Sequence, residues 1–165
     1  MEYLPIARYE MERLDQALIP LERAIGMIPA DRLQERPVAD ARTIGELIHH
    51  IYNVLQVTIL GVKFGKYHEE DGKDLPDSIK TLRSKDALLS HARSVRAWIR
   101  ETAAGLGEEQ VSQQVTFHFG DFEAQAYGID ALNYAYMELL HHRGQVHTLL
   151  RLIGIQPPDI YDVQE

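Results

Sequence analysis

Four long segments of this chain repeat apolar residues every three or four positions, and that spacing constrains the fold more than any other feature. Residues spaced in this way lie along one face of an α-helix, and such a face is stable only when it packs against other elements. The second segment has a clear start, because Thr43 and Glu46 together are typical of a helix-capping box. We therefore expect an all-α fold, a four-helix bundle in a single domain over residues 1–165. The expected helices are about Ala7 to Met27, a stretch opening at Ile44, a stretch capped by Ser84 that ends near Gly105 or Gly107, and about Ile129 to Ile153.

The connections between these helices differ in character. Gly65 to Lys80 is polar and rich in Asp and Gly, which predicts a loop. Between the third and last helices, Val115, Phe117 and Phe119 alternate with polar residues, a period typical of a strand. The stretch from Val111 to Tyr127 is therefore expected to be a long crossover connection, either extended or folded into a short β-hairpin.

Composition and charge exclude several classes of protein. The net charge is −8 and no run of Lys and Arg offers a basic surface, so nucleic acid is not an expected partner. The absence of cysteine excludes disulfides, thiolate metal sites and a thiol nucleophile on the protein itself. The longest uncharged helical stretch, Leu47 to Val62, is too short to span a bilayer, and Met1 to Pro20 has no signal-peptide core. A cytoplasmic protein is the expectation.

Histidines gather at two places in the predicted bundle. His49 and His50 form a pair on the second helix, and His141 and His142 form a pair on the last. Glu138 lies four residues before His142, so these two side chains share a helix face. If His50 faces inward, the bundle brings His50, Glu138 and His142 together across two helices. Two imidazoles and a carboxylate suit zinc, nickel or ferrous iron and leave positions open for water or substrate.

Two other interpretations of these residues stay open. A histidine on a helix face is commonly a surface residue or a hydrogen-bonded core residue, and Glu138 could simply pair with a neighbouring side chain. The sequence also contains two Glu-x-x-His motifs, Glu46 to His49 and Glu138 to His141, which make half of a ferritin-like di-iron site. Glu22 is the candidate for a further carboxylate, but the middle of the third helix, residues 87–100, has no acidic residue.

Two stretches resemble motifs of the DinB/YfiT-like superfamily. The segment Thr43-Ile44-Gly45-Glu46-Leu47-Ile48-His49-His50-Ile51 is similar to the second-helix motif of that family, in which one histidine follows a hydroxyl cap. The expected helices match the family in order and length over nearly the whole chain. The C-terminal signature is matched by His142-Arg143-Gly144-Gln145, then Leu149-Leu150-Arg151-Leu152-Ile153-Gly154-Ile155, then Pro157-Pro158.

The resemblance implies a four-helix bundle, commonly a homodimer, that holds a divalent metal with one histidine of the second helix and two of the last. By position, two of these ligands are His50 and His142, and the third position holds Glu138 instead of a histidine. A carboxylate there lowers the positive charge of the site and favours harder metals. The candidate ions are Zn, Ni, Mn and Fe. The alternates to this ligand set are His141, His147 and His49, or a degenerate site that holds no metal.

The remaining signature residues are expected to have packing roles. Arg143 and Gln145 lie off the ligand face, so we expect them to join helices through hydrogen bonds or salt bridges. Gly144 is expected to let a neighbouring helix approach closely.

For function, the resemblance implies a metal-dependent enzyme that transfers a low-molecular-weight thiol, such as bacillithiol or mycothiol, to an electrophilic small-molecule substrate. A metal lowers the pKa of a bound thiol, and a chain without cysteine must take that thiol from a cosubstrate. One alternative is a metal-dependent hydrolase in which Tyr134, Tyr136 or His141 assists proton transfer. The other is a non-catalytic, dimeric stress-response bundle with a vestigial metal site.

Overall fold

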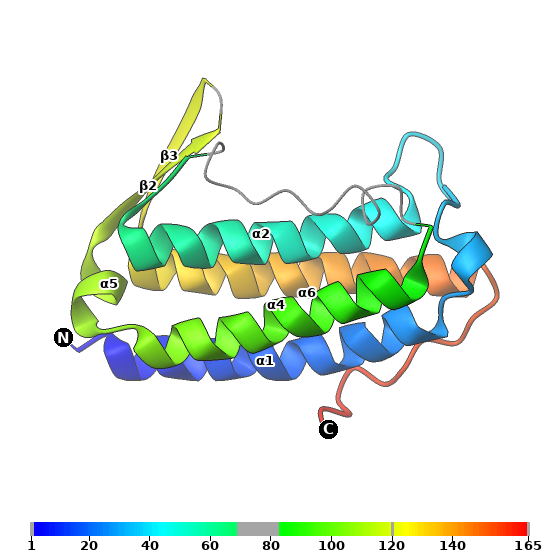
Figure 1. The fold of residues 1–165 in the computed structure, drawn as a ribbon, viewed down its shortest axis with the longest axis horizontal. Coiled ribbons are helices and arrows are strands. Elements are labelled where there is room, and N and C mark those ends of the chain that lie inside the picture. Colours follow the sequence, from blue (N-terminus) through cyan, green and yellow to red (C-terminus); the bar gives the residue numbers. More distant parts are fainter. Residues whose placement is uncertain (1, 69–82, 120, 165) are drawn as a thin grey trace.

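The computed structural model describes residues 2–68, 83–119 and 121–164 of the chain. Within these residues four long helices form the body of the molecule, which confirms the expected bundle (Figure 1). Their apolar faces meet in one continuous core, to which each of the four helices contributes fully or almost fully buried side chains. The long helices are α1 (Leu4–Met27), α2 (Ile44–Phe64), α4 (Lys85–Gly105) and α6 (Gly128–Leu152).

The helices do not simply alternate in direction. Figure 1 shows α1 and α6 running one way and α2 and α4 running the other. The last helix, α6, packs against both α1 and α2, and α4 packs against α1.

Local sequence signals fix the helix ends. The Thr43 side chain accepts a hydrogen bond from the backbone N–H of Glu46, and the Glu46 carboxylate accepts one from Thr43, so the capping box is confirmed. Ser84 caps α4 through the N–H of Ala87, as expected. At the other end of α2, Gly65 takes up a left-handed conformation with φ of 74°.

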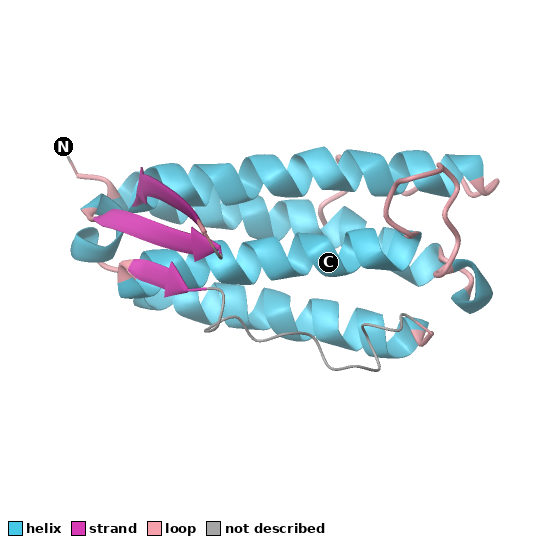
Figure 2. Cartoon of the chain, turned by 90° about the horizontal axis from the view of Figure 1, so that it is seen from above, coloured by secondary structure: helices cyan, strands magenta, loops and turns pink. Residues whose placement is uncertain are grey.

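The connection from α4 to α6 contains the expected hairpin. Its strands are β2 (Gln114–Phe119) and β3 (Phe122–Tyr127), which pair antiparallel, and β1 (Lys66–His68) pairs in parallel with β2. The three strands lie together over one end of the bundle (Figure 2). Gly61 of α2 allows this close contact, since a Cβ at that position would lie 2.3 Å from the ring of Phe117.

Three short elements have no periodic signal in the sequence. They are η1 (Ala30–Arg32), α5 (Glu108–Ser112) and β1, and β1 begins inside the segment predicted to be a loop. The rest of that predicted loop, from residue 69 to Lys80, lies outside the described residues, as does Gly120 at the hairpin turn. Within the described part of the chain, no helix is both long enough and apolar enough to cross a membrane.

The prediction for Gly144 is wrong. A Cβ built at this glycine meets nothing within 4 Å, so no neighbouring helix approaches it. Close approach does occur at Gly128, where a Cβ would lie 2.3 Å from the carbonyl oxygen of Gln110 in α5. In α6, the glycine that close packing requires is therefore Gly128 at the start of the helix and not Gly144 of the signature.

Candidate metal centre

His50, Glu138 and His142 meet between α2 and α6. Because these helices lie side by side, His50 on α2 faces His142 on α6, with ring centroids 4.8 Å apart and ring planes at 83°. One turn before His142, Glu138 places its Oε2 atom 3.2 Å from the His142 Nε2 atom. His142 is buried and the other two side chains are half-buried.

The geometry of these three residues fits a divalent ion. One ligand atom from each lies within 4.8 Å of the others, and no other group of three or more such residues comes together in the described part of the chain. Ligand atoms held at about 2.1 Å around a tetrahedral ion lie about 3.4 Å apart, so the widest pair needs to close by only about 1.4 Å. Three protein ligands would leave coordination positions open.

Gln145 orients the two histidines of α6. Its Oε1 atom lies 2.8 Å from the Nδ1 atom of His142, and its Nε2 atom lies 3.1 Å from the Nε2 atom of His141. An amide oxygen only accepts hydrogen bonds, so Nδ1 of His142 is the donor to Gln145, and Nε2, which faces Glu138, is the atom available as a metal ligand. A hydrogen bond of this kind commonly orients the metal-binding histidines of proteins.

The surroundings keep His50 neutral. Burial is the largest cause that lowers the pKa of His50. Electrostatic interactions with Arg42 and His142 act in the same direction, and the result is a pKa of about 4 despite the opposing charge of Glu138. At neutral pH the imidazole therefore keeps a lone pair free to bind a metal. Burial also raises the pKa of Tyr134, and the charge of Glu138 and a hydrogen bond to it add to this effect.

The alternate ligands lie elsewhere. His49 lies toward α4, where its charge adds to the burial that lowers the pKa of His91. His147 is buried near Arg143 and Arg151 and lines a different cleft. His141 is exposed, and it contacts the centre through Gln145 and through the edge of the His142 ring, with ring centroids 4.8 Å apart.

The di-iron alternative does not fit the structure. Glu46 is held in the capping box and by an ion pair with Arg36. Glu22 lies 3.8 Å from Arg96 of α4, in another part of the bundle interior. Of the groups expected to assist proton transfer, Tyr134 and His141 lie beside the centre, whereas Tyr136 packs its ring against the guanidinium of Arg13 on α1.

An apolar pocket and a polar groove adjoin the centre. The apolar pocket has a volume of about 560 Å³, lies between the hairpin and the two helices, and has His50 and Tyr134 on its wall. The polar groove, of about 950 Å³, is lined by Arg36, Arg42, His141 and Gln145 among others. Of the three candidate ligands, His50 lines the apolar pocket, whereas the groove contains none of them and meets the centre through His141 and Gln145.

The residues matched by the signature do not all have the expected roles. Arg143 donates a hydrogen bond to the carbonyl oxygen of Ala17 and so ties α6 to α1, as expected of a packing residue. Gln145 was expected to join helices, but its hydrogen bonds go to His141 and His142 of its own helix. Gln145 follows His142 by three residues and His141 by four. This helical spacing was the signal in the sequence that could have predicted both contacts.

Comparison with known proteins identifies the class of protein. The family model described as the DinB superfamily matches residues 13–146, and the chain belongs to this superfamily. No curated protein sequence matched the chain.

Two solved structures from Bacillus subtilis resemble the chain. The DinB-like protein YjoA is 18% identical with a TM-score of 0.70, covering 92% of this chain and 96% of YjoA. YfiT is 16% identical with a TM-score of 0.69, covering 91% of this chain and 89% of YfiT, and it is described as a probable metal-dependent hydrolase with an unusual four-helix bundle topology. At these identities the likeness shows the fold alone.

Proposed function

We propose that this protein is a divalent-metal-dependent enzyme whose metal is bound by His50, Glu138 and His142. The observation that carries this proposal is the convergence of these three side chains from two helices, with the Nε2 lone pair of His142 directed to the centre by Gln145. The description of YfiT as a probable metal-dependent hydrolase supports metal dependence. Zn, Ni, Mn and Fe are the candidate ions, and the carboxylate favours the harder ones.

The reaction we propose is transfer of a low-molecular-weight thiol to an electrophilic small molecule. When bound, the metal supplies Lewis acidity and lowers the pKa of a coordinated thiol or water. The thiol must be a cosubstrate, because the chain has no cysteine. The apolar pocket that includes His50 supports binding of an organic reactant beside the metal, and the nearby groove with Arg36 and Arg42 is a candidate site for the second reactant.

Hydrolysis is the second candidate, favoured by the description of YfiT. In that case water would take the place of the thiol as the nucleophile, and Tyr134 or His141 would assist proton transfer from that water. The thiol dependence of turnover separates the two reactions. Metal-loaded protein is incubated with an electrophile such as 1-chloro-2,4-dinitrobenzene and a panel of thiols, and with activated esters in the absence of thiol.

Metal binding itself is tested by equilibrium dialysis followed by elemental analysis. We expect one ion per chain in the wild type and loss of tight binding in His142→Ala. His118→Ala removes a histidine of the sheet and serves as the matched control, with wild-type binding expected. Equal binding by all three proteins would contradict the proposed site.

We also propose, from the family resemblance, that the protein is a homodimer. Analytical ultracentrifugation tests this, and a single species with the mass of one chain at micromolar concentration would contradict it.

A further inference from the structure

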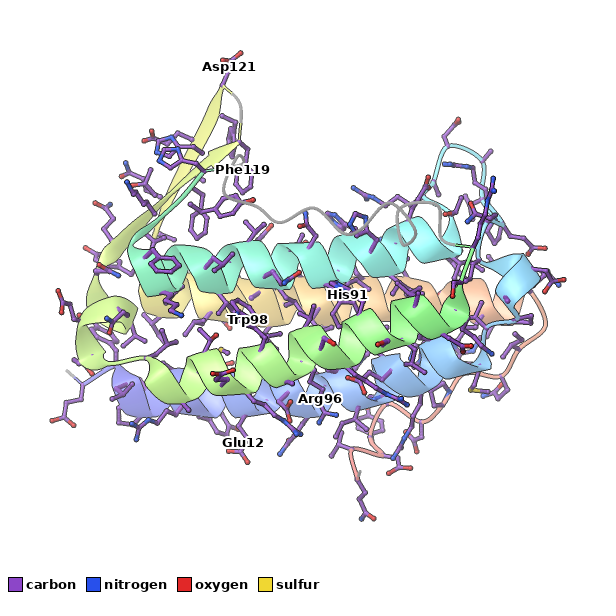
Figure 3. All side chains as sticks on the ribbon, viewed as in Figure 1. Glu12, His91, Arg96, Trp98, Phe119 and Asp121 are labelled. Atoms are coloured by element: carbon purple, nitrogen blue, oxygen red, sulfur yellow. The ribbon has the colours of Figure 1, made fainter. Side chains whose placement is uncertain are left out.

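The apolar pocket beside the candidate centre owes its shape to side-chain size on the hairpin. The inner face of the hairpin is apolar because its residues alternate, and in the strand register Ala124 lies opposite Phe117 and Ala126 opposite Val115. The two alanines leave a hollow next to the rings of Phe117 and Phe119. Figure 3 labels Phe119 on the hairpin just below Asp121 at its tip, on the side of the molecule where the hairpin rises over α2.

The floor of the pocket is one stripe of α2. Asn53, Val54, Val57 and Thr58 follow His50 at helical spacing, and all of them line the cavity. Among the described residues that line the pocket, none is Asp, Glu, Lys or Arg. The pocket therefore suits an uncharged, mainly apolar group.

Three of the five polar residues that line the pocket lie near the candidate centre, and the other two, Thr58 and Gln125, come from farther along α2 and from β3. His50 is one of the proposed ligands, Tyr134 interacts with Glu138, and Asn53 lies one turn from His50 on the same helix. A molecule in the pocket thus has an apolar environment along most of its length and hydrogen-bonding groups at the end nearest the centre. Recognition sites for small organic molecules commonly combine these two features.

We propose that this pocket binds the uncharged aromatic or branched apolar body of the substrate, with its reactive polar group at the end near His50. This inference rests on the proposed function and names the substrate class. A volume of about 560 Å³ lies within the range of small-molecule sites. The same volume would hold little more than one turn of a helix about 10 Å across, so a small molecule fits better than a protein segment.

The first test needs no metal. N-phenyl-1-naphthylamine, a neutral fluorophore with a naphthyl and a phenyl group, is titrated into metal-free protein and its emission is recorded. We expect saturable binding of one molecule per chain. In Ala124→Phe, which fills the hollow, the Kd should rise at least tenfold. This change corresponds to a loss of roughly 1.4 kcal/mol in binding free energy. In Thr116→Phe, which adds the same ring on the opposite face of the sheet, the Kd should stay within about twofold.

A second pair of variants tests whether a loss of binding comes from the pocket and not from misfolding. Phe122 and Phe64 are similarly exposed, at 64% and 63%, but only Phe122 lines the apolar pocket. Phe122→Ala should weaken binding of the fluorophore, whereas Phe64→Ala should not. Circular dichroism spectra establish that each variant is folded.

The second test links the pocket to the metal. On zinc-loaded protein, naphthohydroxamate should bind at least tenfold more tightly than acetohydroxamate, and Ala124→Phe should remove this difference while acetohydroxamate binding stays unchanged. No binding of the fluorophore, or equal binding by Ala124→Phe and the wild type, would overturn the pocket proposal. Failure of the proposed metal site appears separately, as the absence of zinc binding in the dialysis experiment.

Discussion

Gln145 connects an exposed histidine to a buried one. Its amide contacts the ring nitrogens of His141 and His142 at 3.1 and 2.8 Å, so a single side chain orients both rings. The sequence predicted His50, Glu138 and His142 as a group, because helical spacing places residues on faces. The role of Gln145 was not predicted, because spacing does not say which rotamer a long side chain adopts or which of its neighbours it bonds.

We expect Gln145→Ala to lower zinc affinity about 10- to 100-fold, because the His142 ring loses the bond that orients it. Competition with a chromophoric chelator measures this affinity. Gln16→Ala removes an exposed glutamine of α1 and should leave the affinity unchanged. Wild-type affinity in Gln145→Ala would show that the hydrogen bond has no orienting role.

The lowered pKa of His50 predicts an acid-dependent loss of stability in the metal-free protein. The pKa is about 4 in the folded state against 6.5 for an unperturbed histidine, so the unfolded chain binds the proton first as the pH falls. The contribution of His50 to the free energy of unfolding therefore decreases as the pH falls from about 6.5 to about 4. Urea unfolding at several pH values tests this, and His50→Gln should show a weaker pH dependence than the wild type.

At the scale of elements, one acidic side chain joins α1 to α4. The Asp15 carboxylate accepts hydrogen bonds from Arg96 at 2.8 and 3.0 Å and from Arg100 at 2.8 Å. Burial on its own would raise the pKa of Asp15, but the hydrogen bonds from Arg100 and Arg96 outweigh it and lower the pKa. Arg96, labelled in Figure 3, is 10% exposed, and Arg100 is 49% exposed.

This difference in exposure predicts different costs for the two arginines. Arg96→Ala should lower the free energy of unfolding by about 3 kcal/mol, because it leaves a largely buried carboxylate without its buried partner. Arg100→Ala should cost at most about 1 kcal/mol, because an exposed pair is screened by water. Guanidinium unfolding measures both, and equal costs would contradict the importance of burial here.

The four long helices and the hairpin could be predicted from the sequence, and the three shortest elements, η1, α5 and β1, could not. The capping box at Thr43 and the cap at Ser84 are local signals, and the helices that follow them carry apolar stripes long enough to be recognised. By contrast, α5 is only five residues long and packs its backbone against Gly128, and β1 pairs with β2 far along the chain. Such elements are determined by tertiary contacts, which no periodicity in a short segment reveals.

At the scale of the whole molecule, the candidate centre lies between two helices that are distant in the sequence. A metal bound by α2 and α6 would therefore join the two halves of the bundle. Free zinc at about 100 times its Kd should stabilise the fold by about 2.7 kcal/mol, which corresponds to a rise in Tm of roughly 5–10 °C for a chain of this size. Thermal unfolding with and without EDTA tests this, and a similar rise in His142→Ala would place the bound zinc elsewhere.

The hairpin between α4 and α6 places the two proposed functions, metal binding and recognition of the substrate body, largely on different elements of the fold. The proposed metal ligands belong to the helices, whose packing allows little change, whereas much of the pocket wall belongs to β2 and β3. Exchanging one pair of strands for another from a related protein would then alter which molecules are recognised without disturbing the helical scaffold. In a chain built in this way, substitutions in a short insert at one end change recognition while the helical frame stays the same.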